Sequence, residues 1–189
     1  KARRADDVRR KANENPIIIN ETDLFTFKRK LEHDIKERED WRAACVLVEM
    51  TTGARISEIF AYSHFYTLAN FTGEGRKAYD VWLKDSSHAF KDISLDNAIF
   101  QFGALKGRGS EKSWLPPKPV ILGVGPSDIW NCVYTIIRPA IHKKLLARFP
   151  DTPFYEIPLT AFKNFNQEVN DYIGATFPNA AAIETRYND

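Results

Sequence analysis

The stretch that decides the fold of this chain is Thr51-Thr52-Gly53-Ala54-Arg55-Ile56-Ser57-Glu58-Ile59. A helical pattern ends at Gly53, because glycine readily adopts the left-handed conformation that terminates a helix. A second helical pattern begins near Arg55. Its guanidinium is therefore expected on an opening turn, beside free backbone N–H groups and the positive end of the helix dipole. Glu58, three residues on, is expected on the same face. Spacing alone favours an ordinary surface arginine that pairs with Glu58.

Apolar periodicity predicts helices on both sides of this stretch. Each predicted helix has one apolar face that should turn toward a common core. The predicted helices are Thr22 to the polar break at Glu37–Asp40, Trp41 to about Thr51, Arg55 to about Tyr66, Ile129 to about Phe149 with Ser127 or Asp128 as its cap, and Leu159 to Ile173. The residues expected to face the core are Leu24, Phe25, Phe27, Leu31 and Ile35 in the first helix, Trp41, Ala44, Cys45, Leu47 and Val48 in the second, and Phe162, Phe165, Val169, Tyr172 and Ile173 in the last.

The middle of the chain has the pattern of strands. Apolar and polar residues alternate over Phe100–Leu105, and the glycines and charges of Lys106–Lys112 are typical of a turn. Trp114–Leu122 resumes an extended pattern, with prolines that suit only an edge strand. Helices, then a small sheet, then helices is an α+β order. We therefore expect a mostly helical fold with a small antiparallel β-sheet or hairpin.

Charge is unevenly distributed along the 189 residues, although the net charge is only +2. Residues 1–11 hold six Lys or Arg against two Asp, and a second basic group lies between residues 106 and 118. Such clusters can neutralise DNA phosphates, although a solvated linker and a charged loop would look the same. The basic residues concerned are Lys1, Arg3, Arg4, Arg9, Arg10 and Lys11 in the first group, and Lys106, Arg108, Lys112 and Lys118 in the second.

Composition excludes some other classes of protein. No apolar run approaches the roughly 18 to 20 residues that span a bilayer, so no membrane partner is expected. Cys45 and Cys132 lie in apolar segments without the paired spacing of a zinc site or a disulfide framework. Both are expected to be core thiols of a protein in a reducing cytoplasm. No metal or other cofactor is expected.

The run Thr52-Gly53-Ala54-Arg55-Ile56-Ser57-Glu58-Ile59 resembles the first box of the tyrosine recombinase, or phage integrase, family. That box reads Thr-Gly, a small or apolar residue, Arg, two variable positions, Glu and an aliphatic residue. The resemblance implies that Arg55 binds the scissile phosphate of DNA and that Glu58 supports it.

The run from Leu105 to Pro116 is similar to the β-hairpin of the same family, in which an apolar residue precedes Lys-Gly and a charged turn follows. The resemblance implies that Lys106 is the catalytic lysine, which contacts the minor groove and protonates the leaving 5′ oxygen. Its separation from Arg55 is about twice that usual in the family. Thr72–Ala98 is therefore expected to be an insertion or a differently arranged sheet. Lys84 and Lys77 stay open as alternative catalytic lysines.

Two later elements of the family pattern are missing from the chain. None of its four histidines is followed by Arg three residues later, so there is no His-x-x-Arg box. Tyr187 is not expected to be the nucleophile, because no second cluster of Arg and His precedes it. We expect residues 1–19 to be a basic interdomain arm and residues 20–189 to be about two-thirds of a catalytic domain. The remaining third, with the second arginine, the histidines and the tyrosine, is expected outside this chain, which alone should be inactive.

For the intact protein, the resemblance implies site-specific DNA recombination, as integration or excision, through a 3′-phosphotyrosyl intermediate. It also implies double-stranded DNA as the partner, a homotetramer on that DNA, and a nucleoid-associated location in the cytoplasm. A telomere resolvase of related chemistry, which makes hairpin ends, is one alternative. A non-catalytic DNA-binding protein with the same fold is another. A third is a helical protein-interaction domain in which the sequence Thr-Gly-Ala-Arg occurs by chance. Such a domain would show no salt-sensitive binding to DNA.

Overall fold

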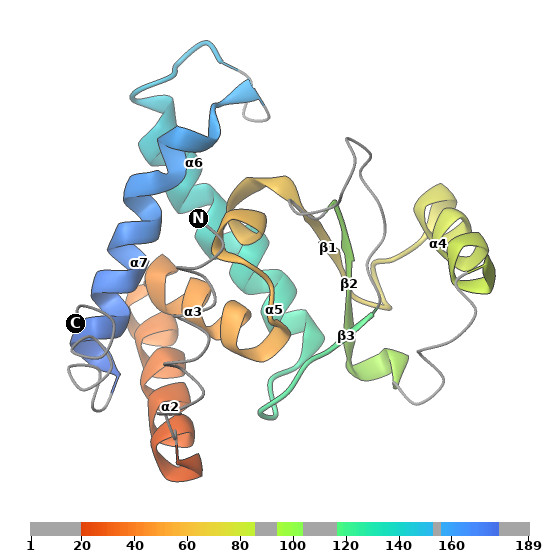
Figure 1. Cartoon of the computed structure of the whole chain (residues 1–189), viewed down its shortest axis with the longest axis horizontal. Helices are drawn as coiled ribbons and strands as arrows, with labels where there is room; N and C mark the ends of the chain where they lie inside the picture. The colour runs from red at the N-terminus through yellow and green to blue at the C-terminus, as the bar shows by residue number, and fades with distance from the viewer. Residues whose placement is uncertain (1–19, 86–93, 104–116, 153–155, 178–189) are drawn as a thin grey trace, which may run out of the picture.

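A computed structural model describes residues 20–85, 94–103, 117–152 and 156–177 (Figure 1). Helices lead into a small three-stranded antiparallel sheet and helices follow it, so the predicted α+β class is confirmed. The regular helices are α2 (Glu21–Arg38), α3 (Trp41–Thr52), α4 (Gly73–Asp85), α5 (Pro126–Asn131), α6 (Arg138–Leu146) and α7 (Lys163–Thr176). The shorter helical segments are η1 (Glu58–Tyr62), η2 (Leu95–Asn97), η3 (Cys132–Ile137) and η5 (Leu159–Phe162), and the strands are β1 (His64–Tyr66), β2 (Ala98–Phe102) and β3 (Lys118–Pro119).

Capping residues fix the ends of the first two helices. Asn20 caps α2 by accepting a hydrogen bond from Asp23 N at 2.7 Å. Asp40 caps α3 by accepting one from Arg42 N at 2.9 Å. α3 ends at Gly53, whose φ of 65° is in the left-handed region that glycine tolerates. Both helices therefore lie within two residues of their predicted bounds.

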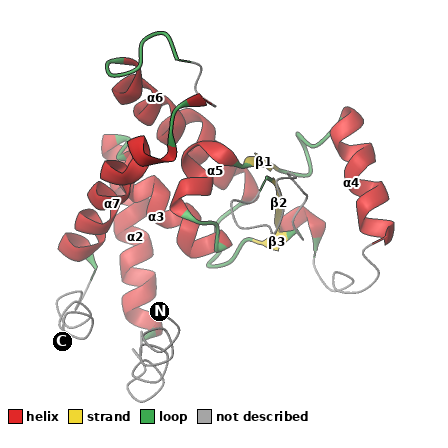
Figure 2. Cartoon of the chain, turned by 45° about the horizontal axis from the view of Figure 1, so that its top comes forward, coloured by secondary structure: helices red, strands yellow, loops and turns green. Residues whose placement is uncertain are grey.

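The main core surrounds α3, which packs against α2, α7 and the π-helical segment η3 (Figure 2). The residues predicted to face inward from α3 and α7 are buried or partly buried, and most of those predicted from α2 are too. Phe25 is the exception, because its side chain is 40% exposed near the start of α2. Cys45 and Cys132 are free, buried thiols, and burial raises the pKa of Cys132 to about 12.

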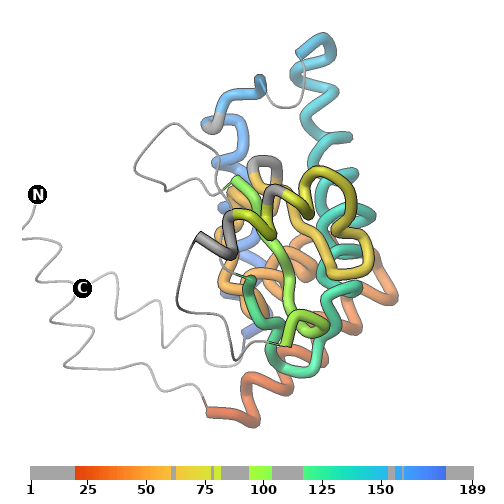
Figure 3. Tube along the Cα trace, turned by 90° about the vertical axis from the view of Figure 1, so that its right-hand side faces the viewer, coloured from red at the N-terminus to blue at the C-terminus, as the bar shows by residue number. Residues whose placement is uncertain are grey.

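The sheet has the order β1-β2-β3, and β2 pairs antiparallel with both neighbours. Ile99 on β2 belongs to the main core, whereas Phe100 joins a second apolar cluster with Phe71 and Tyr79. Tyr79 lies on α4, which therefore covers the opposite side of the sheet from the main helices (Figures 1 and 3). The short strand β3 lies at the sheet edge, as its prolines predict.

One prediction for the middle of the chain was wrong, and one alternative is excluded over part of its range. Residues 73–85 of the stretch expected to be an insertion or a differently arranged sheet form a regular helix, α4, so no sheet forms there, and an insertion stays a prediction. Val81-Trp82-Leu83 is a short apolar run, which strands and helices share. The third helix ends at Tyr62 and His64–Tyr66 forms β1, because this strand pairs with β2. A backbone hydrogen bond from Phe65 N to the Tyr134 hydroxyl, at 2.9 Å, also holds the strand. Tertiary pairing overrides the local helical pattern here.

The C-terminal half contains two long helical units. α5, η3 and α6 run continuously from Pro126 to Leu146. The predicted cap was wrong: Gly125 is the N-cap, and Asp128 reaches back to accept its backbone N–H at 3.1 Å. α7 follows η5 and extends the predicted C-terminal helix to Thr176. None of the described helices is long and apolar enough to cross a membrane.

A buried carboxylate joins α2 to α7. Asp34 is 1% exposed, and Lys30 donates to both of its oxygens at 2.5 Å. The Tyr172 hydroxyl, on α7, donates to Asp34 Oδ2 at 2.6 Å, and Arg38 lies 3.8 Å from Oδ1. Burial opposes ionisation of Asp34. The hydrogen bonds from Lys30 and Tyr172 outweigh it, and the pKa falls below the ordinary value of 3.8.

Replacing Asp34→Asn is expected to lower the free energy of unfolding at pH 7 by about 2 kcal/mol, since it weakens these charge-assisted hydrogen bonds. The pKa of Asp34 is lower in the folded than in the unfolded state. Its contribution is therefore complete above pH 3.8 and is lost as the pH falls through the folded-state pKa. Denaturant unfolding of both proteins at a series of pH values tests this. A stability difference that stays constant into acid would contradict it.

Candidate phosphate-binding site

Arg55 lies two residues after the glycine that ends α3, in the turn that leads into η1. Its backbone N–H donates to Glu58 Oε2 at 3.1 Å, and its Nη1 lies 3.5 Å from Glu58 Oε1. Half of the Arg55 side chain is exposed. The backbone N–H that the sequence predicts to be free for an anion is therefore occupied by Glu58. The guanidinium remains as the group that can meet a ligand.

Glu58 is held by residues far away in the sequence. Its side chain is 4% exposed, and its Oε2 also accepts a hydrogen bond from Gln101 Nε2 at 3.1 Å. Gln101 Nε2 donates as well to Ser63 Oγ at 2.8 Å, and Ser63 Oγ donates to Gly103 O at 2.6 Å. A chain of polar contacts thus joins the Arg55 turn to the end of β2 and fixes the carboxylate that orients Arg55.

Arg138 secures η1 from the other side. It begins α6, and its Nε donates to Ile59 O at 3.2 Å while its Nη2 donates to Ser63 O. Its guanidinium lies over the Tyr134 ring, 4.7 Å from the centroid. Burial lowers the pKa of Arg138, whereas its contact with Tyr134 raises it. No carboxylate in the described ranges pairs with Arg138, so its task in the structure is to hold backbone carbonyls.

Lys118 lies near Arg55, although the sequence predicts it only as a member of the second basic group. It lies on β3, and the charges of Glu58 and Arg55 both act on it. Burial lowers the pKa of Lys118, Glu58 raises it, and Arg55 lowers it. The signal that identifies Lys118 is its register on the sheet, which depends on a pairing that the sequence alone does not give.

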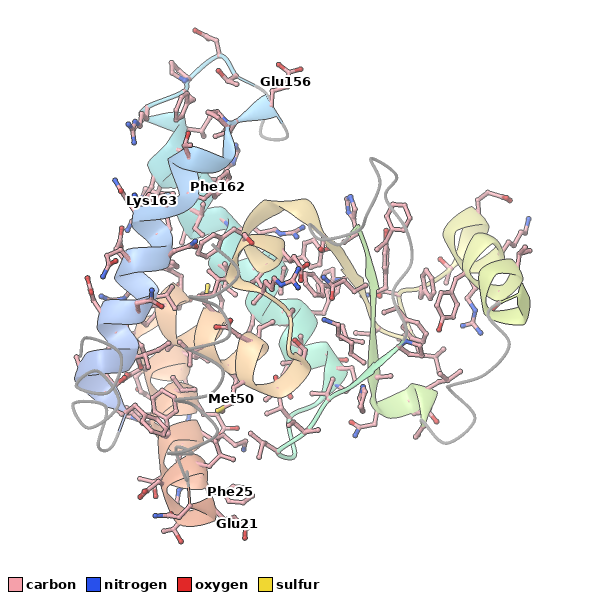
Figure 4. The ribbon with its side chains drawn as sticks, in the orientation of Figure 1. Glu21, Phe25, Met50, Glu156, Phe162 and Lys163 are labelled. Carbon is pink, nitrogen blue, oxygen red and sulfur yellow. The ribbon has the colours of Figure 1, made fainter. Side chains whose placement is uncertain are left out.

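An open groove of about 450 Å³ separates the end of α3 from β3. One wall is made by residues 50–53 and the other by residues 117–119 and Ile121. In Figure 4, Met50 lies in the part of the molecule toward Phe25 and Glu21, which mark the start of α2. Arg55 is not itself a lining residue, but it follows the first wall by two residues in the chain, and its side chain is half exposed. Lys118 lies in the second wall.

The other predicted site residues are not brought to this groove in the part of the chain that the structure describes. Lys77 is exposed on α4 and pairs with Glu74 at 2.6 Å, across the sheet from the main core. Lys84 lies on the same helix. Lys106, Arg108, Lys112, Tyr187 and the basic residues Arg3, Arg4, Arg9, Arg10 and Lys11 lie outside the described residues.

No protein-family model matches this chain, and comparisons with characterised proteins and with solved structures give no match. The described residues contain no group of three potential metal ligands. At the groove, the buried carboxylate of Glu58 pairs with Arg55, and its charge also acts on Lys118. Such an arrangement leaves a net positive charge, which suits a singly charged anion such as a phosphodiester.

Proposed function

We propose that this chain carries the Arg55 part of a DNA strand-exchange site of the tyrosine recombinase type. In the intact protein, Arg55 would bind the scissile phosphodiester of double-stranded DNA. The observation that carries the proposal is the half-exposed Arg55 guanidinium, oriented by a carboxylate that Gln101 holds in place. An arginine suits this task because its planar fork binds two oxygens of one phosphate and keeps its charge at every physiological pH.

The reaction follows from the resemblance of the Thr52–Ile59 run to the first box of that family. A tyrosine hydroxyl, supplied from outside this chain, attacks the phosphorus, and the bond from phosphorus to the 5′ oxygen breaks. A 3′-phosphotyrosyl link and a free 5′-hydroxyl result, with Lys106 proposed to donate the proton to the 5′ oxygen. Arg55 would stabilise the charge that builds on the nonbridging oxygens. The covalent link conserves the bond energy, so the strand can be rejoined without ATP.

Arg55→Gln is expected to weaken binding of the chain to a short DNA duplex and to lower its salt dependence. Loss of one phosphate contact reduces the slope of log affinity against log salt concentration by about 0.9. Fluorescence anisotropy titrations at several salt concentrations measure this slope. Arg29→Gln is the matched control, because Arg29 is an exposed arginine on α2. Equal slopes for the Arg55→Gln variant and the wild type would count against the proposal.

A telomere resolvase of related chemistry is a second candidate, and one observation favours it. Residues between Arg55 and the predicted hairpin form the additional helix α4, with its own apolar cluster beyond the sheet. Large insertions are common in that group. Sequencing the DNA products of the intact protein separates the two, because a resolvase leaves hairpin ends and a recombinase leaves exchanged strands.

A further inference from the structure

We propose that Lys118 is a second ligand of the phosphodiester that Arg55 binds, so that the anion is held between the end of α3 and the edge strand β3. This inference rests on the proposed function and adds a residue to its site. It is carried by the position of Lys118 in the groove wall, by the register of the sheet, and by the absence of a partner for the ammonium group among the described residues.

The register places Lys118 on the face of the sheet that carries the Arg55 network. Lys118 is paired with Ile99 of β2, and antiparallel partners point to the same face. Ile99 points into the main core, so Lys118 is directed to that side of the sheet. Gln101, two residues after Ile99, points to the same face and donates to Glu58. Lys118 and the carboxylate that orients Arg55 thus share one side of β2.

The ammonium group of Lys118 can still donate hydrogen bonds to a ligand. In the described part of the chain, no carboxylate pairs with Lys118 and no side chain accepts a hydrogen bond from it, although it is only partly exposed. A partly buried charge without a partner is unfavourable, and an incoming anion would relieve this. The two charged groups that act on Lys118, Glu58 and Arg55, are already paired with each other.

The groove lies between the turn that leads to Arg55 and the strand that carries Lys118. Its two walls come from the residues just before Arg55 and from those around Lys118, and Pro117 and Pro119 restrict the backbone on either side of the lysine. A fixed backbone reduces the conformational freedom that Lys118 loses on binding. The positive pair lies at an open surface, where a duplex backbone can reach it.

The test is a double-mutant cycle on the purified chain with a short DNA duplex. Lys118→Gln and Arg55→Gln are each expected to weaken binding about tenfold, as expected for loss of one charge-assisted contact. The double variant should lose clearly less than the product of the two, because both residues bind one phosphate. Lys143→Gln, at an exposed lysine of α6, is the matched control and should change affinity less than twofold. Lys118→Arg should retain most of the binding.

Each outcome decides the inference. If the effect of Lys118→Gln equals that of Lys143→Gln, or multiplies with that of Arg55→Gln, the shared ligand is refuted while the role of Arg55 stands. If Arg55→Gln has no effect, the proposed function fails as well. Thermal unfolding of each variant shows whether it is folded. Lys118→Met, which keeps the apolar stem, replaces Lys118→Gln in the cycle if the latter is unfolded.

Discussion

Arg138→Met is expected to lower the free energy of unfolding by about 3 kcal/mol. The change removes the donors that satisfy Ile59 O and Ser63 O, and both of these residues are 0% exposed. An orphaned buried carbonyl costs about 1 to 3 kcal/mol. Removal of the partly buried charge offsets some of this loss, which keeps the estimate below the sum of the two. For a chain of this length the melting temperature should fall by about 9 °C.

Thermal and denaturant unfolding of the wild type and the variant measure this effect. Arg148→Met is the matched control, because Arg148 is exposed just beyond the end of the same helix. It should shift the free energy of unfolding by less than about 0.5 kcal/mol. Arg138→Lys should lie between the two, since it keeps a donor but not the fork that bridges two carbonyls. An Arg138→Met variant as stable as the control would show that Arg138 does not secure η1.

Arg55→Lys in the intact protein is expected to reduce formation of the covalent DNA complex at least 100-fold while DNA binding is retained. Lysine keeps the positive charge that attracts the duplex, but it lacks the fork that binds two phosphate oxygens in the transition state. Loss of one preorganised donor to a developing oxyanion costs about 10²–10³ in rate. The defect should therefore lie in chemistry and not in affinity.

A nicked suicide substrate measures this directly, because the cleaved strand cannot be rejoined and the covalent complex accumulates. Arg29→Lys, at an exposed arginine of α2, should form the complex at the wild-type rate. The rate for Glu58→Gln should also fall, since Glu58 orients the guanidinium through the 3.5 Å ion pair. Undiminished cleavage by the Arg55→Lys variant would contradict the assignment of Arg55 as the residue that binds the scissile phosphate.

Local patterns predict much of the helical fold. α2, α3 and α7 each have several apolar side chains at helical spacing, and caps or a glycine mark the ends of α2 and α3, so periodicity and capping find them. α4 was missed because Val81-Trp82-Leu83 is a short apolar run, which strands and helices share. β1 was missed because its conformation depends on pairing with β2, about 36 residues later.

Local sequence patterns likewise predict only part of the candidate site. Arg55 and Glu58 are three residues apart, so their ion pair follows from local helical geometry. Gln101 reaches across the fold to donate to Glu58, and Arg138 reaches across it to hold the carbonyl of the next residue, Ile59. Lys118 enters through a strand register that no short-range pattern encodes. The sequence therefore identifies the pair itself, and the fold supplies its support.

The most direct measurement of the central claim is the side-chain Nε–Hε resonance of Arg55 during a titration of the chain with a short DNA duplex. If Arg55 binds a phosphate, this resonance should shift and saturate with the same dissociation constant as anisotropy gives. The shift should be absent with the Arg55→Gln variant, which also identifies the signal. A resonance of Arg55 that stays in place while the duplex saturates the protein would contradict the account.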